Sequence, residues 1–182
     1  MNLLYRYLVA PCSTLEANGG RVPMTEGLVV VGLLALSWCL TPEIGGYFTL
    51  ALLSALSVGA FILIGVFIQA VTLDFVAQWM GFKAQSKALF AWFCLGLMPL
   101  LLGGIIGVFE PFLPTLVGMI HLGLCLGVMV LQWQTLRVLY GASPGKTTVI
   151  YLFPGLIFLL ISVFLTVLLM GVGVASMASV FN

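Results

Sequence analysis

Long stretches without charge constrain this chain more than any other feature of its sequence. Segments 47–73, 88–109, 114–136 and 148–174 contain no Asp, Glu, Lys or Arg. A helix of roughly 20 apolar residues crosses the hydrocarbon core of a bilayer, and each segment is long enough to do so. Only 6% of the 182 residues are charged, whereas a soluble domain carries about 25%. The sequence therefore predicts an integral membrane protein.

These segments predict an all-α membrane protein, a bundle of five transmembrane helices preceded by a short interfacial N-terminal segment. A shorter apolar stretch precedes the four long ones and begins at Pro23, where a missing backbone N–H costs nothing. Pro99 and Pro154 predict kinks within two spans. We divide the chain into an N-terminal segment, 1–22, and a transmembrane domain, 23–182. The spans are expected at about 23–41, 47–73, 88–109, 114–136 and 148–174.

The N-terminal segment is expected to lie on the membrane surface. Residues 2–10 are apolar and aromatic around a single cation and are too few to span a bilayer. They predict a short helix in the interface, with Tyr5 and Tyr7 at the level of the headgroups. Residues 13–16 have capping-box spacing, which predicts a second short helix that ends at residues 18–20.

The distribution of the cations predicts the orientation of the chain. All six lie in the segments 1–22, 74–87 and 137–147. They are Arg6, Arg21, Lys83, Lys87, Arg137 and Lys146. The alternate turns contain Glu43 and Glu110 and no cation. Cytoplasmic loops are enriched in Lys and Arg, so we expect a cytoplasmic N-terminus and a C-terminus on the opposite side. A compact chain without long soluble tails favours a bacterial inner membrane.

Two pairs of glycines have the spacing at which helices approach closely in a membrane. Gly103 and Gly107 lie in the third span, and Gly123 and Gly127 lie in the fourth. Small residues four positions apart allow two helix backbones to come together. A short turn joins these spans, so they are expected to be antiparallel neighbours that pack through the glycines. A contact between chains in an oligomer is the alternative.

Two polar side chains inside the predicted spans are candidates for function. His121 is the only histidine, and Gln69 lies in the second span. Polar groups inside a membrane are costly and often functional. We expect each to form a hydrogen bond with a neighbouring helix, and contact with a solute is the alternative. Asp74 and Glu110 lie at span ends, where water is expected to reach them.

Two partial matches to enzyme motifs occur in residues 140–147, and each lacks a feature that its chemistry requires. Residues 141–145 fit Gly-x-Ser-x-Gly, but Pro144 removes the backbone N–H that an oxyanion hole needs after the serine. Residues 140–147 resemble a phosphate-binding loop, but Tyr140 stands where its first glycine belongs. The segment is interpreted as a turn between helices. The sequence predicts no catalytic, metal or cofactor site, and six cations are too few for nucleic-acid binding.

The order of features resembles the Yip1 family of five-span membrane proteins, and in particular its short bacterial inner-membrane members. The similarity covers nearly the whole chain. It lies in residues 8–15, 79–88, 96–99, 133–141 and 153–154. This resemblance implies the five-helix fold. Eukaryotic members have a longer cytoplasmic N-terminal region and are associated with Rab GTPases, but that region is short here, so Rab recruitment is not implied.

The sequence therefore predicts a non-enzymatic, multi-pass membrane protein that acts by helix packing with lipids, with partner membrane proteins or with copies of itself. The alternative is a small-solute or ion permease with a polar path near Gln69 and His121. A cavity lined by both side chains would favour transport, and a bundle filled with side chains would favour the packing role.

Overall fold

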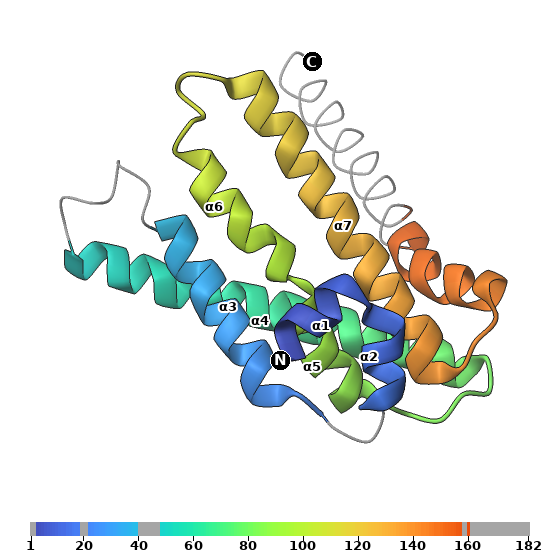
Figure 1. Cartoon of the computed structure of the whole chain (residues 1–182). Helices are drawn as coiled ribbons and strands as arrows, with labels where there is room; N and C mark the ends of the chain where they lie inside the picture. The colour runs from blue at the N-terminus through green and yellow to red at the C-terminus, as the bar shows by residue number, and fades with distance from the viewer. Residues whose placement is uncertain (1–2, 19–21, 40–47, 158–159, 161–182) are drawn as a thin grey trace, which may run out of the picture.

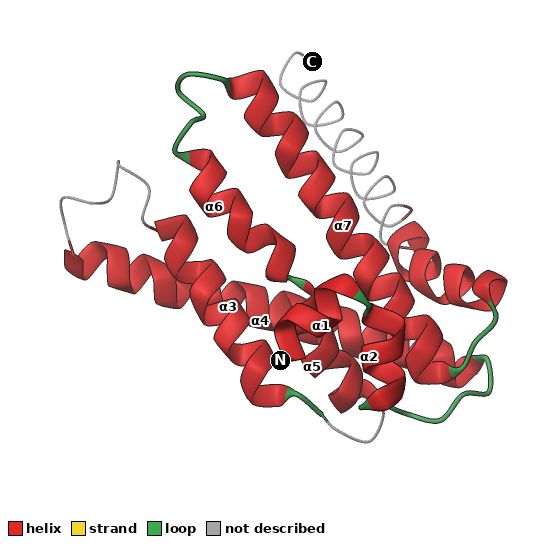
Figure 2. Cartoon of the chain, viewed as in Figure 1, coloured by secondary structure: helices red, strands yellow, loops and turns green. Residues whose placement is uncertain are grey.

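The computed structural model describes residues 3–18, 22–39, 48–157 and 160 (Figure 1). Within these ranges the chain is helical and contains no strand (Figure 2). The all-helical class predicted from the sequence is therefore confirmed for the described part.

Among the described residues, short turns join α1 to α2, α4 to α5 and α6 to α7. α1 and α2 form an N-terminal hairpin, α3 and α4 follow, and a single turn of 3-10 helix, η1, separates α5 from α6. The bounds are Leu3–Val9 (α1), Pro11–Ala17 (α2), Met24–Cys39 (α3), Phe48–Trp79 (α4), Ser86–Gly96 (α5), Met98–Leu100 (η1), Leu101–Gly107 (α6) and Pro114–Tyr140 (α7). A further helical segment covers residues 144–157.

Three helical stretches are long and apolar enough to cross a membrane: Leu52–Trp79, Ser86–Gly107 and Pro114–Tyr140. They correspond to the second, third and fourth predicted spans. Met24–Trp38, in the first predicted span, is apolar but shorter. The fifth predicted span, 148–174, lies largely outside the described residues. The fold is thus typical of a helical membrane protein, and the count of five spans stays a prediction.

Two of the predicted loops, 74–87 and 137–147, are too long. α4 continues past position 73 to Trp79, and α7 continues past position 136 to Tyr140. The next helical segment begins at residue 144, so only residues 141–143 lie between it and α7. Both helices continue because some residues beyond the predicted span ends pack in the core. Val76 on α4 is one of these buried residues. Gly141, with φ of 58°, caps α7 in the left-handed conformation that glycine adopts without strain.

Pro99 breaks the third predicted span, as expected from the sequence. Proline has no backbone N–H and its ring clashes with the carbonyl group four residues earlier. α5 therefore ends at Gly96, and the chain passes through η1 before α6 begins.

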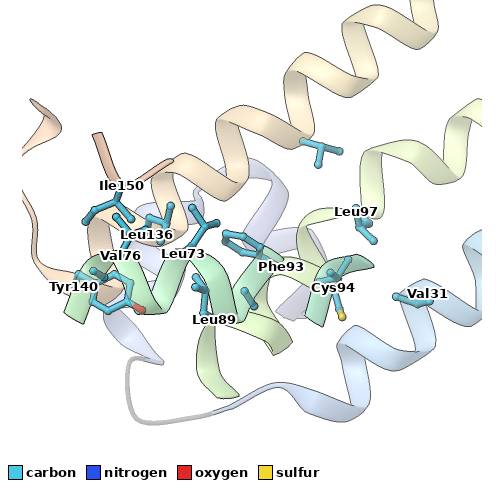
Figure 3. Packing of buried hydrophobic residues seen from close by; sticks show 14 of the residues in the cluster. Val31, Leu73, Val76, Leu89, Phe93, Cys94, Leu97, Leu136, Tyr140 and Ile150 are labelled. Carbon is cyan, nitrogen blue, oxygen red and sulfur yellow. The ribbon is translucent and has the colours of Figure 1, made fainter. Parts of the chain in front are cut away.

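The best-packed part of the core lies where α4 and α7 end and α5 begins (Figure 3). Its side chains come from these three helices and from the segment after α7. They include Leu73, Val76, Leu89, Phe93, Leu136, Tyr140 and Ile150. Large apolar side chains on the parts of α4, α6 and α7 away from this end, such as Phe61 and Leu122, are exposed. One end of the molecule is therefore consolidated by side-chain packing.

The N-terminal hairpin packs on this end of the molecule and corrects two predictions. Tyr5 is exposed, as expected for the interface, but Tyr7 is buried, and its ring lies 5.2 Å from that of Trp92. The Tyr7 hydroxyl shares a hydrogen bond of 2.7 Å with Thr135 Oγ1, and burial raises the pKa of Tyr7 to about 12. α2 begins at Pro11, not at Ser13, because proline suits the first helical turn.

Close approach of α3 to its neighbours depends on two glycines that the sequence analysis did not select. A Cβ atom on Gly27 would lie 2.8 Å from the Ala91 carbonyl oxygen of α5. A Cβ atom on Gly104 of α6 would lie 2.7 Å from Ser37 Oγ of α3. Small residues thus allow α3 to approach both α5 and α6, which are the two halves of the helix that Pro99 breaks. We call α5, η1 and α6 together the broken helix.

Replacing Gly27 with alanine should therefore destabilise the protein by about 1–3 kcal/mol, because the methyl group meets backbone atoms that cannot move aside cheaply. The matched control is Gly32→Ala in the same helix, where a Cβ atom meets nothing within 4 Å. Thermal unfolding in a mild detergent measures both variants. A Gly27→Ala protein as stable as the Gly32→Ala control would contradict the close crossing.

Candidate functional site

Three uncharged polar side chains meet between α4, α7 and the helical segment 144–157. Gln69 Nε2 donates a hydrogen bond to Gln132 Oε1 at 3.0 Å. The hydroxyl of Tyr151 donates to the same oxygen at 2.9 Å. Gln132 Nε2 lies 3.5 Å from Gln69 Oε1, which makes the two amides face each other. We call Gln69, Gln132 and Tyr151 the polar trio.

The polar trio follows from the scarcity of water in a bilayer. An amide that enters the hydrocarbon region without a partner loses the hydrogen bonds that it makes in water. Gln132 is buried, and its carbonyl oxygen accepts hydrogen bonds from donors on two other helices. The trio therefore fixes the rotation of α4 and of the segment 144–157 relative to α7.

A cavity of about 940 Å³ lies beside the polar trio. Its wall comes from α4, α7 and the segment after α7. The lining residues are Gly65, Ile68, Gln69, Thr72, Leu73, Met129, Thr148, Val149, Tyr151, Leu152, Phe153, Pro154, Gly155 and Leu156. Several of them are exposed on the outer surface, so the cavity is open to the side. Its size falls within the range of about 300–1,000 Å³ that is usual for ligand sites.

A smaller cavity, of about 290 Å³, lies between α3, α4 and the helix that Pro99 breaks. Gly65 and Gln69 line both cavities. The remaining wall of the smaller one is apolar and includes Leu34, Trp38 and Leu97. The Gln69 side chain therefore borders both cavities.

His121 lies apart from Gln69. Its Nδ1 atom is 3.0 Å from the Val117 carbonyl oxygen, within its own helix. We predicted a hydrogen bond from His121 to a neighbouring helix. The partner that the structure shows is instead in the same helix as His121. His121 lies eleven positions before Gln132 on α7, which is about 16 Å along the axis. It lines neither of the two cavities at Gln69.

The four glycine candidates also have different surroundings. Gly103 is buried, and a Cβ atom there would lie 3.1 Å from His121 Nε2. Gly103 therefore makes room for the imidazole ring where α6 meets α7. A Cβ atom on Gly107, Gly123 or Gly127 meets nothing within 4 Å. The structure does not bring the two glycine pairs together.

Asp74 is buried, and the expectation that water reaches it is wrong. Its Oδ1 atom accepts hydrogen bonds from the Gln85 backbone N–H at 2.8 Å and from the Tyr140 hydroxyl. Its Oδ2 atom accepts one from Gln78 Nε2 at 2.9 Å. The Gln85 side chain in turn donates to the Leu139 carbonyl oxygen at 3.1 Å. The Asp74 carboxylate thus connects the α4–α5 turn to the end of α7. We call Asp74, Gln85 and Tyr140 the Asp74 clamp.

The described cations lie around this clamp and the N-terminal hairpin. Lys83 is in the α4–α5 turn, and Lys87 is in the first turn of α5. Arg137, in the last turn of α7, lies over the ring of Trp133. Lys146 Nζ lies 5.9 Å from the centre of the Phe82 ring. Since α5 and α6 run away from this end, the α6–α7 turn, which contains Glu110, is at the other end of the molecule (Figure 1).

The segment 141–147 is a turn followed by a helix start. Thr147 bonds back to the Ser143 carbonyl oxygen through its backbone N–H and through its hydroxyl. No group of three or more His, Cys, Asp or Glu side chains suited to a metal ion occurs among the described residues.

Sequence reasoning missed three of the residues that build these sites: Gln132, Tyr140 and Tyr151. Gln132 carried the same signal as Gln69, a polar residue inside an apolar span. The tyrosines gave no signal, since tyrosine is common near membrane interfaces.

No protein-family model, curated protein or solved structure matches this chain. Its function is therefore argued from its own geometry.

Removing the Asp74 carboxylate should destabilise the packed end. We expect Asp74→Ala to cost about 1–3 kcal/mol, because the Gln85 N–H and the Tyr140 hydroxyl lose their acceptor in a buried place. Asp74→Asn keeps one acceptor oxygen and should cost less. Thermal unfolding of both variants in detergent tests the clamp, and equal midpoints for Asp74→Ala and wild type would rule it out.

Proposed function

We propose that this chain is a Yip1-like, multi-pass membrane protein that is not an enzyme and acts by packing its helices against lipids or membrane-protein partners. The proposal rests on one observation above all. Polar side chains deep in the three candidate spans bond to the protein itself, as Gln69 does to Gln132 and His121 to Val117. The Oε1 atom of Gln134 is an exception, buried without a hydrogen-bond partner in the described part.

The outer surfaces of the candidate spans support the same proposal. Exposed large apolar side chains extend along α4, α6 and α7, with Phe61, Ile105 and Leu122 as examples. In water such surfaces would drive aggregation, whereas in a bilayer they contact lipid tails or other apolar helices.

The cation-rich end supports a cytoplasmic N-terminus. Lys83 is in the α4–α5 turn, Lys87 begins α5, Arg137 is in the last turn of α7 and Lys146 follows α7. These helix ends lie at the same end of the molecule as the N-terminal hairpin (Figure 1). Glu110 lies in the turn at the opposite end. With the positive end inside, the α6–α7 turn faces outward, and the proposed fifth span would carry the C-terminus to that side.

A permease is the second candidate, because two cavities meet at Gln69. His121 lines neither of them, so the polar path expected from the sequence has only one of its two residues. Liposomes containing the purified protein test this candidate. Flux of a small solute or ion that Gln69→Leu abolishes would favour the permease over the packing role.

Two glycine substitutions separate packing within the chain from packing with a partner. Gly103→Leu should destabilise the monomer by about 1–3 kcal/mol, because the new side chain meets His121. Gly123→Leu meets open space in the described chain, so it should leave stability nearly unchanged while it weakens contact with a partner or a second copy. Gly118→Leu, also in open space on α7 and rotated away from Gly123, is the control.

The readouts are thermal unfolding and recovery of co-purifying membrane proteins, or of a second tagged copy, in mild detergent. Loss of co-purification with Gly123→Leu but not with Gly118→Leu supports the proposal. If all three variants fold and co-purify like wild type, packing through these glycines has no role.

A further inference from the structure

We propose that the cavity of about 940 Å³ binds an uncharged lipid whose head carries a hydroxyl or carbonyl group. This inference rests on the proposed function, since it requires that the candidate spans lie in a bilayer. It goes further by naming the class of molecule that contacts one surface of α4, α7 and the segment 144–157.

The lining excludes a charged ligand. None of the described residues that line the cavity is Asp, Glu, Lys, Arg or His. The nearest carboxylate along α4, Asp74, already accepts hydrogen bonds from Gln78, Gln85 and Tyr140. An ionised head at this depth would therefore lie in a low-dielectric place without a counter-charge, which is costly.

The polar groups of the lining gather around the polar trio. Gln69 and Tyr151 both bond to Gln132, and Thr72 and Thr148 lie three positions from them in their helices. The other lining residues are apolar or small. This grouping matches a lipid whose head lies at the polar trio and whose tail contacts the apolar wall.

The polar trio leaves hydrogen-bonding capacity for such a head. The Gln69 amide has two N–H hydrogens, and its contact with Gln132 uses one of them. The Tyr151 hydroxyl donates to Gln132, and its oxygen can still accept. Both side chains line the cavity. A hydroxyl group on the ligand can accept from Gln69 and donate to Tyr151, and a carbonyl group can accept from Gln69.

Gly65 gives the tail its room. A Cβ atom on this residue meets nothing within 4 Å, and Gly65 borders both the larger and the smaller cavity. A leucine at this position would fill space now open in the wall without striking a neighbour through its Cβ atom.

A photoactivatable probe tests the site directly. Hexadecanol with a diazirine in its chain is irradiated with the purified full-length protein in detergent, and adducts are located by peptide mass spectrometry. Competitors with the same chain length are hexadecanol, hexadecane and palmitate, the last at about pH 10, where its carboxyl group is ionised even though the micelle raises the pKa of that group. We expect adducts within residues 65–73 and 148–156, removed by hexadecanol far more efficiently than by palmitate or hexadecane.

Two variants and one control complete the test. Gly65→Leu should lower labelling measurably, because its side chain occupies part of the wall space that the lipid tail would contact. Gln69→Leu should reduce the advantage of hexadecanol over hexadecane by roughly threefold to tenfold, which corresponds to one lost hydrogen bond. Gly32→Leu, in open space on α3 and outside both cavities, should label like wild type. Circular dichroism and gel filtration verify that each variant is folded.

The proposal is overturned if palmitate competes as well as hexadecanol, or if folded Gly65→Leu and Gln69→Leu both behave like wild type. Carbonate extraction of the same membranes separates this result from the proposed function. A chain released by carbonate contradicts the membrane assignment, whereas a retained chain that the probe does not label at this site contradicts only the lipid site.

Discussion

A bilayer core supplies no water, so each polar group that enters it needs a partner inside the protein. In this chain that constraint determines which helices meet. Gln69 reaches Gln132 across α4 and α7, and Tyr151 joins them from the next helical segment. Nearer the end of α4, Asp74 clamps the α4–α5 turn to Tyr140. These contacts orient helices whose apolar surfaces alone would let them rotate freely in lipid.

The same contacts explain why the packed core is concentrated at one end. The Asp74 clamp and the N-terminal hairpin, anchored by Tyr7 against Trp92, hold α5 and the end of α7 together. Beyond Pro99 the broken helix continues as α6, where Gly103 adjoins His121. Farther from the clamp, exposed apolar side chains on α4 and α7 favour contacts with lipids or partners, which is the basis of the proposed function.

The positions of the long helices could be predicted from the sequence. A helix that crosses a bilayer needs about 20 residues without charge, and runs of that length are easily recognised. The partners of each residue could not be predicted in the same way. A helix that is apolar all round carries no signal for the direction of each face, so Gln69 could be selected without its pairing to Gln132. Glycine spacing likewise indicated Gly103 but not Gly27, whose role depends on the position of α5. Burial of Asp74 depends on a turn that bends back over it, which local sequence does not reveal.

We propose that the helix broken at Pro99 crosses the bilayer from a cytoplasmic, cation-rich end to an outer turn. Single cysteines at Lys83 and Glu110, in a chain whose four native cysteines are replaced, test it most directly with a membrane-impermeant maleimide. The account predicts that Lys83→Cys reacts only in inside-out vesicles and that Glu110→Cys reacts only in intact spheroplasts. Reaction of both positions from the same side, or of Lys83→Cys from outside, would contradict it.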